Sequence, residues 1–237
     1  MALILNIETS TEVCSVSLAE NGKTLYLKES TEGLNHSRLL TVFIEDLFRE
    51  NNFDIHKIDA VAVSKGPGSY TGLRIGVSVA KGLCYGLGKP LIGIGSIEAM
   101  GHYVAENVGE FYAEGEGEEL LFCPMIDARR MEVYTALFEI GGKAVNEVTA
   151  EIIDENSFAN HLQTKKIMFF GNGADKCREK ITHPNALFNG PDKTTARFMQ
   201  NLAEMKYNKK EFEDVAYFEP FYLKDFVATI PKNKVLK

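Results

Sequence analysis

The sequence predicts an α/β protein built from two lobes. Of its 237 residues 45% are hydrophobic, enough for a sizeable core, and the length lies at the border between one domain and two small ones. Strand-like and helix-like patterns alternate, and the same succession of strands, polar turn and further elements occurs before and after the acidic segment 109–119. We therefore expect an N-terminal lobe over 1–106, which a tail of about 207–237 can rejoin, and a C-terminal lobe over 107–206.

The N-terminal lobe is predicted to begin with an antiparallel meander. Apolar alternation on either side of the polar turn 8–11 predicts two strands, and Asn21-Gly22 then signals a hairpin, because both turn positions favour positive φ. Ser37 is a candidate N-cap for the helix that follows. The patterns predict strands at 3–7, 13–18, 25–27, 59–64 and 91–94, and helices at 38–50, 71–87 and after Ser96.

The C-terminal lobe is predicted from the same kinds of pattern. The preceding segment 109–119 carries five Glu and no Lys or Arg, and its glycines and like charges are typical of a solvated surface loop. Beyond it we expect strands at 120–126, 132–138 and 167–170, turns at 127–130 and 171–173, and helices near 174–181 and 194–206.

Two helices of the first lobe carry more apolar surface than one sheet requires. On 38–50 the apolar residues form two adjacent stripes, which suggests two neighbours, and on 71–87 most of the circumference is apolar. Gly72, Gly76 and Ala80 recur at every fourth position. A glycine inside a helix costs about 0.5–1 kcal/mol relative to alanine, so we interpret these residues as a flat ridge for a second chain, with packing inside the lobe as the alternative. The predicted partner interface consists of Leu39, Leu40, Phe43, Leu47, Gly72, Leu73, Gly76, Val79, Ala80 and Leu83.

Strong catalytic and metal-binding motifs are absent from the sequence. No two of the five His are three to five residues apart, so no helix offers a ready metal-binding pair, and no G-x-S-x-G elbow occurs. The four Cys include no CxxC pair, which favours reduced thiols and a cytoplasmic location. We expect no membrane segment, because no apolar run approaches the roughly 20 residues that span a bilayer. The net charge of −7 without a basic cluster implies that any RNA is held mainly by another chain.

Two polar turns are the candidates for a nucleotide site. Glu8 and Asp127 end predicted strands, where a carboxylate can hold a nucleotide-bound metal, although each could equally cap the turn that follows. The loop 66–72 precedes a helix and could bind an anion, but it lacks the ending of a P-loop and Pro67 removes a donor. The candidate nucleotide-proximal residues are Glu8, Thr9, Ser10, Asp127, Arg129, Gly171 and Gly173.

Several stretches, in order from residue 3 to residue 226, resemble the signature blocks of the TsaB (YeaZ) family, and KGPGSYTGLRIGVSVAKGL is the most specific of them. The resemblance implies a two-lobed actin/sugar-kinase-like (ASKHA) fold and a role in making threonylcarbamoyladenosine beside the tRNA anticodon. It also implies a catalytic partner, TsaD, which holds the metal and transfers the threonylcarbamoyl group, and an ATPase, TsaE, which joins the assembly. The other stretches are LILNIETSTEVCSVSL, NHSRLL, PLIGIGSIEAM, IDARRMEVYTALF, FFGNGA and PFYLKDF.

The same resemblance implies that this chain has no catalytic residue, metal or cofactor of its own. ATP or ADP and metal are expected on partner chains, tRNA is expected to be reached only through the complex, and the chain is expected to form a homodimer in isolation through its N-lobe helices. The family was once labelled glycoprotease-like, but nothing in these residues supports peptide hydrolysis. Four residues depart from the family pattern, which commonly has Asp, Glu, Gly and Arg at their positions: Glu8, Arg38, Met131 and Lys224.

A non-catalytic partner subunit is the preferred hypothesis. We expect Leu or Arg in place of Gly76 or Ala80 to prevent complex formation and leave the monomer folded. The alternative is a small ASKHA-type ATPase or phosphotransferase acting alone, with ATP held by Glu8, Asp127 and the turn 171–173. A peptidase is a third and less favoured hypothesis.

Overall fold

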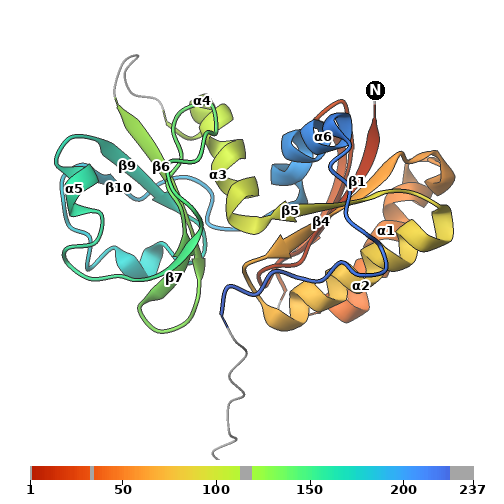
Figure 1. Cartoon of the computed structure of the whole chain (residues 1–237), viewed down its shortest axis with the longest axis horizontal. Coiled ribbons are helices and arrows are strands. Elements are labelled where there is room, and N and C mark those ends of the chain that lie inside the picture. The colour runs from red at the N-terminus through yellow and green to blue at the C-terminus, as the bar shows by residue number, and fades with distance from the viewer. Residues whose placement is uncertain (1, 33–34, 113–118, 225–237) are drawn as a thin grey trace, which may run out of the picture.

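The computed structural model describes residues 2–32, 35–112 and 119–224, and these form two lobes, each built on a five-stranded sheet (Figure 1). Most of the predicted acidic loop, residues 113–118, and residues 225–237 of the tail lie outside the described residues. Among the described residues, no helix combines the length and the hydrophobicity needed to cross a bilayer.

The two sheets have the same topology. In the N-terminal lobe the order is β3-β2-β1-β4-β5, with β1 to β3 antiparallel and β4 and β5 parallel to β1. In the C-terminal lobe the order β10-β9-β6-β7-β8 repeats this arrangement, with β6 in the place of β1. The similarity expected between the two halves is therefore confirmed. The strands are β1 Leu3–Glu8, β2 Cys14–Glu20, β3 Lys23–Ser30, β4 Ala60–Gly66, β5 Leu91–Gly95, β6 Leu120–Asp127, β7 Glu132–Thr135, β8 Thr149–Ile152, β9 Lys166–Phe170 and β10 Ala186–Leu187.

The helices cover both faces of the N-terminal sheet. Helices α1 and α2 lie on one face, whereas α3 and α6 lie on the other, between the two lobes (Figure 1). The α-helices are α1 His36–Glu50, α2 Tyr70–Leu87, α3 Ser96–Glu106, α4 Val108–Phe111, α5 Ala159–Leu162 and α6 Gln200–Lys209, and the 3-10 helices are η1 Ile55–Lys57, η2 Asp175–Cys177 and η3 Ala196–Met199.

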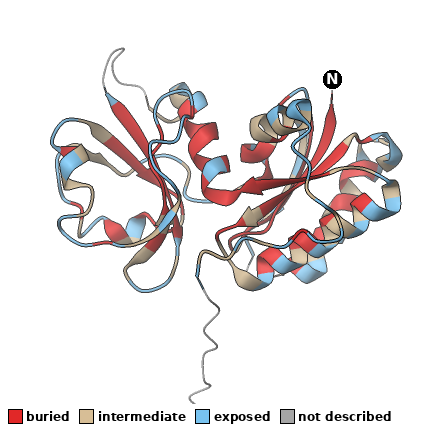
Figure 2. Ribbon diagram, viewed as in Figure 1, coloured by how far each residue is buried: buried red, intermediate tan, exposed pale blue. Residues whose placement is uncertain are grey.

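One hydrophobic core joins the lobes. Helix α3 is buried along nearly its whole length, whereas α1 and α2 alternate between buried and exposed residues (Figure 2). Met100 and Tyr103 of α3 share a cluster with Ile92 of the first sheet and with Phe122 and Met168 of the second. Helix α6 contributes to the same cluster, and the sheets are therefore held by continuous packing.

Several expected elements differ in detail. Helix α1 begins at His36 after Asn35, which makes no side-chain cap, so Ser37 is not the N-cap. The helix expected near 174–181 is only the 3-10 turn η2, and the one at 194–206 divides into η3 and α6. Strands β8 and β10 were not predicted, because four and two residues are too short for a reliable alternation.

The segment 211–224 returns to the N-terminal lobe along α2. Glu213 bridges to Leu91 of β5, and the backbone N–H of Phe221 donates to the carbonyl of Lys65. The Lys81 ammonium donates to the carbonyls of Ala216 and Phe218 at 3.0 and 2.9 Å. Arg74 and Lys81 on the polar side of α2 are therefore engaged by this segment, since Arg74 also donates to the hydroxyl of Tyr222.

Candidate functional site

The small residues of α2 face inward. A Cβ atom added at Gly72 would overlap the carbonyl oxygen of Thr9, and one added at Gly76 would overlap the Thr9 hydroxyl. Ala80 is fully buried in the core between α1, α2 and the sheet. The expectation that this ridge is open to a second chain is therefore wrong, because the close approach that the small residues permit is used by the turn after β1.

The same burial removes three larger residues from the predicted interface. The side chains of Leu40, Leu47 and Leu73 are at most 1% exposed, so they pack within the lobe and are not available to a partner. The four remaining residues of the predicted set are half-buried and border the molecular surface: Leu39, Phe43, Val79 and Leu83.

Helix α2 presents a different small-residue ridge to solvent. Ser78, Gly82 and Gly86 are exposed at successive i, i+4 positions, and a Cβ added at either glycine would meet no atom within 4 Å. Tyr85 beside them is 87% exposed. The outward face of α2 thus combines exposed small residues with apolar side chains. The centre of this exposed ridge lies more than a quarter-turn around the helix from the centre of the ridge predicted from the sequence.

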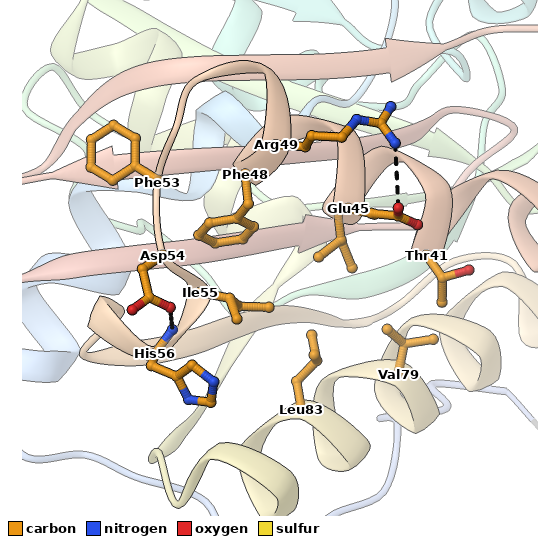
Figure 3. A pocket seen from close by; sticks show the side chains of 11 residues that line it. Thr41, Glu45, Phe48, Arg49, Phe53, Asp54, Ile55, His56, Val79 and Leu83 are labelled. Atoms are coloured by element: carbon orange, nitrogen blue, oxygen red, sulfur yellow. Dashed lines mark hydrogen bonds and ion pairs between the residues drawn. The ribbon is translucent and has the colours of Figure 1, made fainter.

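A groove separates α2 from α1 and η1, with a volume of about 520 Å³. Val79 and Leu83 project from α2 toward Phe48 and Ile55 on the opposite side (Figure 3). Its rim is polar, where Arg49 pairs with Glu45 at 3.3 Å. The eleven lining residues are Thr41, Ile44, Glu45, Phe48, Arg49, Phe53, Asp54, Ile55, His56, Val79 and Leu83.

The turn after β1 is stabilised from within. Glu8 is buried, and its carboxylate accepts a hydrogen bond from the backbone N–H of Ser10 at 2.5 Å. Burial raises the pKa of Glu8 above its ordinary value, opposed by hydrogen bonds from Ser10 and Ser64. Thr9 and Ser10 are buried against α2 and the loop before it. Glu8, Thr9 and Ser10 therefore build this turn and offer little surface to a nucleotide.

This carboxyl gives the fold a pH dependence. With a raised folded pKa, the stabilisation by protonated Glu8 is complete below about pH 4.5 and is lost as the pH rises through the folded pKa. The wild type should therefore lose stability relative to Glu8→Gln as the pH rises above about 4.5. Thermal unfolding at a series of pH values measures the difference, with the exposed Glu139→Gln as control. A difference in thermal stability between wild type and Glu8→Gln that does not change with pH would contradict the raised pKa of Glu8.

The candidate residues of the C-terminal lobe are brought together at the ends of β6 and β9. The exposed Asp127 carboxylate accepts from the backbone N–H of Arg129 at 2.9 Å and forms an ion pair with Lys176. Gly173 donates its backbone N–H to the Met125 carbonyl at 3.0 Å, and Gly171 (φ 97°) packs against the same carbonyl. The two glycines therefore allow a tight turn to rest on β6.

The polar turns of the two lobes meet directly. The Asn172 amide donates to the Glu12 carboxylate at 2.9 Å, and the Thr11 and Thr194 hydroxyls lie 2.6 Å apart. Side chains of the chain itself thus occupy the junction where the two candidate turns approach each other. Neither Glu12 nor Asn172 was singled out in the sequence, because residues 160 positions apart give no local signal.

The thiols do not suit a nucleophilic role. Cys14, Cys84, Cys123 and Cys177 are all buried and unpaired. Burial raises the pKa of Cys14 and Cys177 to about 11 and that of Cys84 to about 12, and it raises the pKa of Cys123 as well. These sulfur atoms are therefore thiols and not thiolates at neutral pH. Within 2–32, 35–112 and 119–224, no three His, Cys, Asp or Glu side chains gather as a metal site.

Comparison with known proteins finds relatives along the whole chain. Residues 31–232 match the family described as TsaD, tRNA N6-adenosine threonylcarbamoyltransferase. The chain is 27% identical to the tRNA threonylcarbamoyladenosine biosynthesis protein TsaB of Haemophilus influenzae, covering 95% of this chain and 94% of that protein. It is 28% identical to TsaB of Bacillus subtilis, with 93% of each covered. YeaZ from Pseudomonas aeruginosa has the same fold, with a TM-score of 0.77, 24% identity, and coverage of 94% of this chain and 100% of that one. The chain therefore belongs to the TsaD family and, within it, to the TsaB (YeaZ) group, whose members are named for tRNA threonylcarbamoyladenosine biosynthesis.

Proposed function

We propose that this chain is a non-catalytic partner subunit that acts with a TsaD-type transferase and a TsaE-type ATPase in threonylcarbamoyl transfer to the adenosine beside the tRNA anticodon. The observation that carries the proposal is the outward surface of α1 and α2. We define the docking face as Leu39, Phe43, Val79, Gly82, Leu83 and Gly86.

The docking face has the properties of an interface for an apolar helix. Its leucines and Phe43 are half-buried, and the groove beside them is apolar at its base and charged at its rim. Gly82 and Gly86 allow a second backbone to approach α2 closely. Tyr85 adds an exposed aromatic ring, a residue type enriched at interfaces. Helices α1 and α2 pack on their own sheet and on each other, and Lys81 holds the segment 211–224, so the docking face is the part of their surface that remains for a partner.

Catalysis is assigned to the partner chains. Glu8, Thr9 and Ser10 are buried and the turns of the two lobes are hydrogen-bonded to each other, which supports placing ATP or ADP and metal elsewhere in the assembly. In this proposal tRNA joins only the complete complex, the isolated chain forms a homodimer through the docking face, and the assembly is cytoplasmic.

Co-purification with reconstitution tests the proposal. The chain and the TsaD-type protein of the same organism are expected to co-elute in size-exclusion chromatography as one species. Threonylcarbamoyl transfer to tRNA by purified TsaD- and TsaE-type proteins is expected to require this chain. Transfer at an unchanged rate without it would contradict the proposal, and so would Mg-ATP turnover by the chain alone with binding tighter than about 10 μM, or roughly 7 kcal/mol.

A further inference from the structure

The turn between β6 and β7 displays two adjacent arginines. Arg129 and Arg130 are both exposed, with φ values of 70° and 51°, in the left-handed region that usually favours Gly or Asn. Across the described ranges 2–32, 35–112 and 119–224, neither guanidinium forms an ion pair or a hydrogen bond. Two adjacent guanidinium groups on a left-handed turn, neither used by the fold, are thus free to bind a ligand outside it.

The turn is held rigid from beneath. The Lys176 ammonium donates to the carbonyls of Arg130 and Glu132 at 2.8 and 2.7 Å and pairs with Asp127. The backbone N–H of Ala128 donates to the Glu132 carbonyl at 3.0 Å. Because Lys176 also neutralises Asp127, the charge of the arginines is left available, and the backbone that carries them is fixed before any ligand arrives.

Further cationic and aromatic groups lie next to these arginines. Lys224, at the end of the described chain, is exposed and pairs with Glu132. Burial raises the pKa of Tyr134, and the nearby charges of Lys224 and Arg129 oppose that rise. This corner of the C-terminal lobe is thus locally basic although the chain carries a net charge of −7. Figure 1 places β7 in the lobe that does not contain α1 and α2.

We infer that Arg129 and Arg130, with Lys224 beside them, form a contact site for RNA phosphates, through which this chain touches tRNA inside the assembly. The guanidinium fork binds phosphate oxygens in a bidentate manner, and its exposure on a protruding turn suits an extended polyanion better than a small nucleotide, which needs an enclosing pocket. The inference rests on the proposed function, since the assembly supplies the remaining RNA contacts.

Salt-dependent binding of an unmodified tRNA transcript to the complex with the TsaD-type partner tests the inference. Each lost phosphate contact lowers the log–log salt slope by about 0.7–0.9. The variant R129A/R130A should therefore reduce the slope by roughly 1.5 and weaken binding by about tenfold. The charge-preserving R129K/R130K should retain the slope. The matched control is K209A/K210A, because Lys209 and Lys210 are also adjacent and exposed, and Lys210 also has a left-handed φ of 57°.

The outcomes separate the two proposals. Equal salt slopes for R129A/R130A and K209A/K210A would overturn the RNA contact, and so would loss of ATP binding by R129A/R130A with tRNA binding unchanged. Size-exclusion chromatography of the same samples shows whether the complex forms. If the wild-type chain forms no complex, the proposed partner function is contradicted and the RNA contact is not. In that case the same titration on the isolated chain at low salt decides the RNA contact.

Discussion

Replacing Gly72 with alanine is expected to lower the free energy of unfolding by about 3 kcal/mol or more, which is large for the addition of one methyl group. The new Cβ would overlap the carbonyl oxygen of Thr9, a backbone atom. The turn cannot easily retreat, because the N–H of Thr9 donates to Ser64 and the Glu8 carboxylate accepts from Ser10. Urea unfolding followed by circular dichroism measures the change.

Gly82→Ala supplies a matched control in the same helix. Its added Cβ meets no atom within 4 Å, so only helix propensity changes. The expected result is a stabilisation of about 0.5–1 kcal/mol. If the two variants were equally stable, the inward packing of Gly72 would be contradicted.

Gly76 offers a further check on the same contact. Its added Cβ would meet the Thr9 hydroxyl, a side-chain atom that has no hydrogen-bond partner in the part of the chain that is described. Thr9→Ala should therefore relieve part of the destabilisation caused by Gly76→Ala. A double-mutant cycle with no coupling energy would show that the two residues are not in contact.

The helical periodicity identified the right helices but not the right side of α2. A repeat of small residues permits close approach by any backbone, and the pattern is the same whether that backbone belongs to a partner or to the β1–β2 turn. Gly72, Gly76 and Ala80 satisfy the turn and the core, while Gly82 and Gly86 face solvent. For the same reason a bulky residue at Gly76 or Ala80 is expected to destabilise the monomer, contrary to the expectation from the sequence.

The order of strands could be predicted from the sequence more completely than the contacts between the lobes. Alternation and turn residues predicted the first meander and the strands that became β4, β5, β6 and β9, because each pattern is local. The junction between lobes depends on pairs such as Thr11 with Thr194, which are 183 positions apart. The hydrogen bonds from Lys81 to the carbonyls of Ala216 and Phe218 also join residues that are far apart in the sequence. On a helical wheel Lys81 reads as a solvated residue, and only the fold supplies the carbonyls that it binds.

Gly82→Arg is expected to weaken binding to the TsaD-type partner by at least about 100-fold, equivalent to roughly 2.8 kcal/mol, and to abolish self-association. In the free chain the new side chain has open space around it, so the fold should be unaffected. In a complex the same side chain would hold the second helix away from α2 or bury an unpaired charge. Analytical size-exclusion chromatography with the partner measures the loss.

Gly109→Arg is the control for this substitution. Gly109 also lies in a helix with no atom within 4 Å of an added Cβ, but in α4 of the other lobe, away from α1 and α2 (Figure 1). It adds the same charge and bulk, so a general effect of either would appear in both variants. Gly82→Ala provides the opposite test, since a methyl group should preserve docking while it stabilises the helix. Normal co-elution of Gly82→Arg with the partner would place the docking surface elsewhere, because this change leaves the monomer intact and closes the face of α2 that its own lobe does not cover.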